Sequence, residues 1–119
     1  MKITVHDEYI RIDARTDPVN KDFLKSLVDF VGQTIAGYPQ QVPPMLLVIE
    51  GPKLELDPID SIEIWKHAVE QGAHRAKIAY VIRGRPIEPV VQFIEMYVHN
   101  RGMQMRFFDN QGDALKWLL

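Results

Sequence analysis

The chain has 119 residues, of which 46% are hydrophobic and 25% are charged, and its formal net charge is −2. This length and composition are typical of one globular domain spanning residues 1–119, and they argue against a wholly disordered chain. The near-neutral charge gives no basic field for nucleic acid, and the lack of cysteine excludes disulfides and thiolate metal sites.

The N-terminal segment carries the acids Asp7 and Glu8 where a signal peptide needs an uninterrupted apolar run. No apolar run approaches the roughly 20 residues of a membrane span. We therefore expect a cytoplasmic protein without a membrane span.

Two short β-prone runs, Lys2 to Val5 and Tyr9 to Ala14, predict a hairpin at an antiparallel edge of a sheet. A helix follows, for which Asp17 and Pro18 have the pattern of an N-cap and a first-turn proline. Gly37 ends the apolar periodicity of this helix.

The run Met45 to Ile49 is apolar without alternation, which predicts a strand in the middle of a parallel sheet that is covered on both sides. The next helix is expected to begin at either Asp57 or Asp60 and to end at Gly72. Its predicted buried stripe contains Ile62, Trp65 and Val69, with Ala68 beside them.

The C-terminal third repeats the alternation of strand and helix. The predicted elements are a strand over Ala76 to Ile82, a helix from about Pro86 to Gly102, a strand over Met103 to Phe108, and a terminal helix capped by Asp109 or Asn110. Phe107 and Phe108 point to opposite faces of one strand, so both can be buried only if helices cover both sides. If one side is bare, the exposed aromatic side chain is a candidate interface or pocket wall.

The predicted order is β-β-α-β-α-β-α-β-α, which indicates an α/β domain with a mainly parallel sheet of four to five strands and right-handed crossovers. This order, with RFFDNQGDALKWLL following KIAYVIRGR, resembles the SpoIIAA-like fold that includes STAS domains. More narrowly, the chain is similar to small bacterial STAS-like proteins. The resemblance begins at about Tyr9 and implies a non-catalytic module that regulates or binds another protein.

STAS domains of anti-sigma-factor antagonists carry a phosphorylatable serine after an aspartate, at the start of the helix that follows a central strand. Asp60 and Ser61 stand at about that place. The family continues with a small residue and glycine, whereas this chain has Ile62 and Glu63. The position of Ser61 makes it our candidate for a phosphate switch, although Ile62 and Glu63 make the segment after it bulkier and more acidic than in the family.

Ligands of parallel sheets gather outside the carboxyl ends of the strands. Arg83, Gly84, Arg85 and Asp109 are expected at this edge, where an anionic group could bind beside a helix N-terminus. In the competing interpretation both arginines are solvated or pair with nearby acids. A small-molecule binding domain for an anionic or apolar ligand is accordingly our alternative function.

We found no motif for catalysis, for a metal or for a cofactor. The four histidines lack the spacing of a metal site, neither serine lies in a GxSxG context, and no standard nucleotide-binding loop is present. An enzyme acting through Arg83, Arg85 and Asp109 ranks last among the hypotheses. We expect another protein as the partner, and the antiparallel edge also allows a homodimer.

Overall fold

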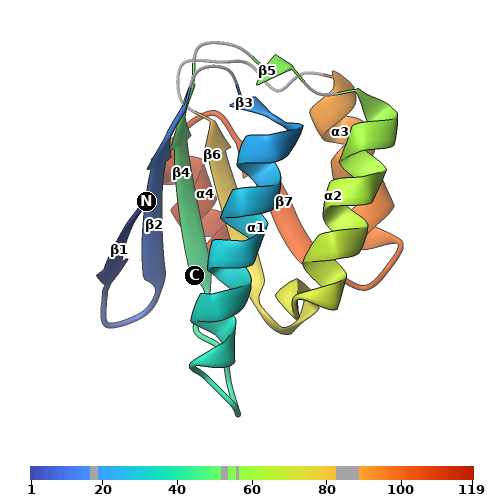
Figure 1. Cartoon of the computed structure of the whole chain (residues 1–119). Helices are drawn as coiled ribbons and strands as arrows, with labels where there is room; N and C mark the ends of the chain where they lie inside the picture. The colour runs from blue at the N-terminus through green and yellow to red at the C-terminus, as the bar shows by residue number, and fades with distance from the viewer. Residues whose placement is uncertain (17–18, 52–53, 56, 83–88) are drawn as a thin grey trace.

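A sheet of five strands forms the centre of the computed structural model, which describes residues 1–16, 19–51, 54–55, 57–82 and 89–119 (Figure 1). The strands are β1 (Lys2–Val5), β2 (Ile10–Arg15), β4 (Met45–Glu50), β6 (Lys77–Ile82) and β7 (Gln104–Phe108). Their order across the sheet is β1-β2-β4-β6-β7, with β1 antiparallel to β2 and the other neighbours parallel. The predicted antiparallel edge is therefore present.

Helices cover both faces of this sheet. The described helices are α1 (Lys21–Ala36), α2 (Pro58–Glu70), α3 (Pro89–His99) and α4 (Gln111–Leu118), with a short 3-10 turn at Ala73–Arg75. Figure 1 shows α1, α2 and α3 on one side of the sheet, here called the three-helix face, and α4 on the other, here called the α4 face. Among the described residues, no helix is long and apolar enough to cross a membrane.

The central strand β4 contributes to a separate hydrophobic core on each face. Met45, Leu47 and Ile49 pack under the three-helix face, and Leu46 and Val48 pack under α4. All five side chains are buried. The prediction of a strand that is apolar on both sides, at the middle of the sheet, is confirmed.

The two phenylalanines of β7 are divided between these cores. Phe107 lies on the three-helix face, where its ring centroid is 5.1 Å from that of Tyr80 and 6.1 Å from that of Trp65. Phe108 is partly buried on the other face, 5.9 Å from the ring of Trp117 in α4. Helices therefore cover both sides of this strand.

The start of α1 differs from the prediction. The helix begins at Lys21, and its N-cap is Asn20, whose side-chain oxygen accepts a hydrogen bond of 3.0 Å from the Phe23 N-H. Asp17 and Pro18, the predicted start, lie outside the described residues. The chain stays extended through Asn20 because β3 (Val19–Asn20) pairs in parallel with β5 (Leu54–Glu55).

The starts of α2 and α4 follow the capping chemistry of the sequence, whereas Pro86, the predicted start of α3, lies outside the described residues. Asp57, the first of the two predicted starts, accepts a hydrogen bond of 2.8 Å from the Asp60 N-H and caps α2. Asn110 caps α4 through a bond of 2.9 Å from the Asp113 N-H. Gly72 has the positive φ of 90° that favours glycine after a helix.

The buried stripe of α2 is rotated from its predicted position. Ile64, Trp65 and Ala68 are buried, whereas the predicted Ile62 and Val69 are only half-buried. The helix packs against both α1 and α3 as well as lying over the sheet, so its buried side faces more than one neighbour. A periodicity count made on one helix cannot include those neighbours.

Candidate functional site

The structure leaves the predicted anion site incomplete. Arg83, Gly84 and Arg85 lie outside the described residues. Asp109 is exposed at the carboxyl end of β7, where its Oδ1 accepts a hydrogen bond of 2.7 Å from the Asn110 side-chain amide. A ligand site at this edge stays a prediction from the sequence.

Ser61 lies in the first turn of α2 and is 1% exposed. Its hydroxyl donates a hydrogen bond of 2.9 Å to the backbone carbonyl of Asp57, the capping residue. A kinase could reach this hydroxyl only if the first turn opened. Phosphorylation of Ser61 therefore stays a prediction. It requires that the hydrogen bonds of the first turn of α2 open.

The outward side of α3 carries apolar side chains that the protein does not cover. Val91, Ile94 and Val98 are buried against the core. Phe93 and Met96, three residues apart on the same side of the helix, are 40% and 66% exposed. We call these two residues the outer α3 face.

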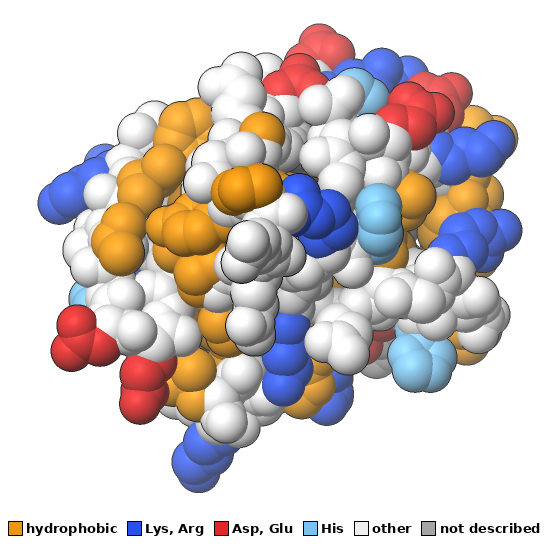
Figure 2. All heavy atoms as spheres, turned by 90° about the horizontal axis from the view of Figure 1, so that it is seen from below, with side chains coloured by type: hydrophobic (Ala, Val, Ile, Leu, Met, Phe, Trp, Pro, Cys, Tyr) orange, Lys and Arg blue, Asp and Glu red, His pale blue; other side chains and the backbone are white. Residues whose placement is uncertain are grey.

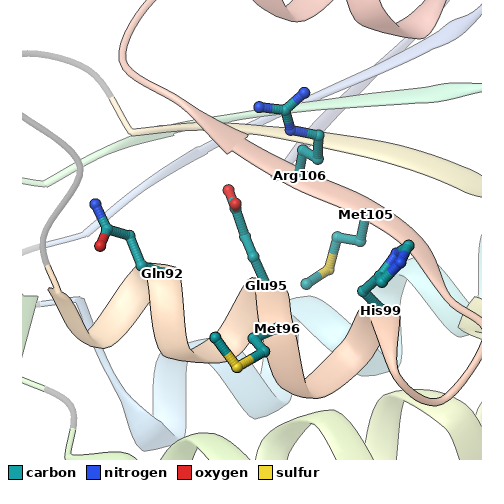
Figure 3. A pocket seen from close by; sticks show the side chains of 6 residues that line it. All are labelled: Gln92, Glu95, Met96, His99, Met105 and Arg106. Atoms are coloured by element: carbon teal, nitrogen blue, oxygen red, sulfur yellow. The ribbon is translucent and has the colours of Figure 1, made fainter.

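A hollow of about 380 Å³ adjoins this face. Figure 3 shows its lining, which comes from α3 and from the outermost strand β7. The lining residues are Gln92, Glu95, Met96, His99, Met105 and Arg106. Met96 belongs to both the hollow and the outer α3 face, so the two form one continuous surface.

Glu95 joins α3 to the open edge of the sheet. Its Oε1 accepts a hydrogen bond of 2.7 Å from the backbone N-H of Phe107, and Figure 3 shows its side chain pointing from α3 toward β7. β7 is the last strand of the sheet, so this N-H has no neighbouring strand to bond. The carboxylate of Glu95 therefore bonds the N-H in place of a further strand. Met96, His99 and Arg106 line the hollow beside it.

A second groove, of about 340 Å³, lies on the other flank of α3, between α3 and α2. Its lining includes the apolar residues Val69 and Tyr97, which are half-buried, and Met103, which is buried. Arg101 lies over the Tyr97 ring, 3.6 Å from the ring centroid, and donates a hydrogen bond of 3.2 Å to the Tyr97 carbonyl. Apolar side chains are therefore accessible on two sides of α3.

The titratable groups with shifted pKa values have structural roles. A hydrogen bond from Lys21 in α1 lowers the pKa of Glu63 in α2. This ion pair links the two helices. Burial raises the pKa of Tyr80, which lies in the core and not in a cleft. Within the described residues, no group of three or more histidine or carboxylate side chains could hold a metal ion.

The sequence contained a signal for the outer α3 face that our prediction did not use. Within the helix predicted from about Pro86 to Gly102, the apolar residues Val90, Ile94, Tyr97 and Val98 recur at helical spacing, and Phe93 and Met96 lie outside that stripe. A helix that is apolar on most of its circumference is usually buried on all sides. The sequence therefore indicated that this helix has more apolar surface than one side of a sheet can cover. The contact between Glu95 and Phe107 had no such signal, because it depends on how α3 lies against β7.

The chain was compared with protein-family models, with curated proteins and with solved structures, and none of the three comparisons found a match.

Proposed function

We propose that this protein is a non-catalytic, STAS-like interaction module that binds another protein through the outer α3 face. The observation that carries the proposal is the exposure of Phe93 and Met96 beside the hollow between α3 and β7. The resemblance in the sequence supports the same class of function. The layered α/β arrangement, with α4 following the last strand, is compatible with it.

The chemistry around the outer α3 face suits a protein partner. Aromatic and methionine side chains are enriched at the centres of protein interfaces, whereas charged groups are common at the rim. Here Phe93 and Met96 form the apolar part, and His99 and Arg106 are exposed near it. The methionine side chain is flexible and adapts to the shape of a partner.

A phosphate on Ser61 is the switch that we propose for this module. It would lie beside the carboxylates of Asp57 and Asp60, which repel it, and it would remove the hydrogen bond to the Asp57 carbonyl. Both effects open the start of α2. The alternative function, binding of a small molecule near Arg83, Gly84 and Arg85, remains a proposal from the sequence.

The proposal is tested by protein capture from a lysate of the protein's own host, with the double variant Phe93→Ser, Met96→Ser. The matched control is Ile59→Ser, because Ile59 is an apolar residue of α2 that is 70% exposed. We expect at least one host protein to bind the wild type and the control, and to be lost with the double variant. Circular dichroism checks that all three chains are folded. Retention of the same proteins by all three chains would contradict a role for the outer α3 face.

A further inference from the structure

The two outer strands of the sheet, β7 and β1, differ in whether a side chain occupies their outward backbone groups. At β7, Glu95 occupies the Phe107 N-H and so blocks the addition of another strand there. Among the described residues, no side chain forms a comparable hydrogen bond with the outward backbone groups of β1. Ile3 and Val5 of β1 are 41% and 68% exposed, and Figure 2 shows hydrophobic side chains gathering toward the side on which β1 lies.

The hairpin geometry establishes which backbone groups of β1 are free. The His6 N-H donates a hydrogen bond of 2.9 Å to the Tyr9 carbonyl, so these two opposed residues form a hydrogen-bonded pair. Such pairs alternate with non-bonded pairs along an antiparallel ladder. Thr4 therefore bonds to β2, whereas Ile3 and Val5 direct their N-H and C=O groups away from β2, toward the open edge.

The same two residues carry the uncovered apolar side chains. Ile3 lies opposite Ile12 and Val5 lies opposite Ile10, and both of these partners are buried on the three-helix face. Directly opposed residues of an antiparallel pair point to the same face. Ile3 and Val5 therefore offer free hydrogen-bonding groups and β-branched side chains to whatever pairs with β1.

The charges near β1 favour a second copy of the same chain over a random strand. Lys2 lies at one end of β1, and Asp7 and Glu8 form the turn at the other end; these three residues are exposed. None of them takes part in an ion pair with another described residue. Antiparallel pairing of two copies brings the Lys2 end of each to the acidic turn of the other.

One register satisfies all these conditions. It places Ile3 opposite Val5 of the second copy, with Thr4 at the two-fold axis, and each of the two Ile3 and Val5 pairs exchanges two hydrogen bonds. A register with Ile3 opposite Ile3 brings the two Lys2 side chains close together. A register with Val5 opposite Val5 places Ile3 opposite Asp7, which leaves an apolar side chain beside an acid.

We propose that a second copy of this chain pairs with β1 in this register, so that one continuous sheet runs through a symmetric dimer. The dimer leaves the outer α3 faces free, because α3 lies beside β7 at the far edge of the sheet. This proposal goes beyond the binding of a partner protein. The two can therefore succeed or fail separately.

The test measures the mass of the full-length chain in solution and hydrogen exchange at single amides, both over a range of protein concentrations. We expect twice the chain mass at high concentration. The exchange rates of the Ile3 and Val5 amides should then be lower than at low concentration by a factor of about ten or more. Thr4 should be protected at every concentration because its N-H bonds to β2. A wild type that stays monomeric, or a dimer whose Ile3 and Val5 amides remain unprotected, would overturn the proposal.

Two variants separate this interface from other surfaces. Val5→Lys places a charge on the open edge and should weaken the dimer at least about tenfold, since a like charge from each copy then enters one interface. Ile59→Lys makes the same change at a residue of similar exposure on α2 and should leave the dimer intact. Loss of the dimer in the Phe93→Ser, Met96→Ser variant, with none in Val5→Lys, would assign self-association to α3 and overturn the proposal.

Discussion

Ser61 is a buried residue within a helix cap, and its substitutions report whether that cap can open. Ser61→Ala removes one local hydrogen bond and should cost about 1 kcal/mol or less of the free energy of unfolding. Ser61→Asp buries a carboxylate next to the Asp57 carbonyl and should cost about 3 kcal/mol or more. Denaturant unfolding measures both, with Ser26→Asp at an exposed position of α1 as the control. A Ser61→Asp chain as stable as the wild type would mean that the turn accepts a charged group as it stands.

Tyr80 makes the stability of the fold depend on alkaline pH. Burial raises the pKa of its phenol above the value of about 10 that it has in the unfolded chain. Below pH 10 both states keep the proton, so this contribution to stability is fully present. Above pH 10 the unfolded state loses the proton first, and the free energy of unfolding falls by about 1.4 kcal/mol per pH unit.

The substitution Tyr80→Phe isolates this effect because it keeps the ring beside Phe107 and removes the titrating group. We expect the pH dependence of unfolding between pH 10 and 11.5 to be shallower by one proton in the variant. Urea unfolding at several pH values gives the comparison. Identical slopes for the two chains would show that the phenol ionises equally well in the folded state.

At the scale of elements, α3 holds the outer edge of the sheet through Glu95. Glu95→Ala removes the acceptor for the Phe107 N-H and should lower the free energy of unfolding by about 1–3 kcal/mol. Glu95→Gln keeps an oxygen acceptor without the charge, so it should lose less. Denaturant unfolding of both variants tests the prediction. Equal losses would contradict this, because the glutamine retains the packing and the oxygen acceptor, and would indicate that the negative charge of Glu95 stabilises the edge.

The elements that the sequence predicted well are those whose pattern is local. The apolar run of β4 required a central position. Acceptor side chains limited two helix starts to Asp57 or Asp60 and to Asp109 or Asn110, and the structure has Asp57 and Asn110. The predicted start of α1 was wrong because β3 and β5 are strands of two residues each, and so short a pairing leaves no recognisable pattern in the sequence. The candidate site was missed in part for a similar reason, since the contact of Glu95 with β7 joins two separate elements.

At the scale of the whole molecule, the sheet has two edges with different chemistry and two faces with different cover. The hydrophobic periodicity was sufficient to predict helices on both faces. It could not predict which edge would be closed, because the bond of Glu95 and the hairpin register of β1 are set by the folded arrangement. One edge and one helix surface thus remain available for contacts on opposite sides of the molecule.

The unequal cover of the two faces bears on how long the protein survives in a cell. Three helices share one face, whereas α4, a helix of 8 residues, covers Leu46, Val48, Ala79 and Val81 on the other. If α4 lifts away, these side chains are uncovered while their strands stay paired. Chaperones and proteases recognise such locally opened states. Turnover of the protein should therefore follow the docking of α4 more closely than the unfolding of the sheet.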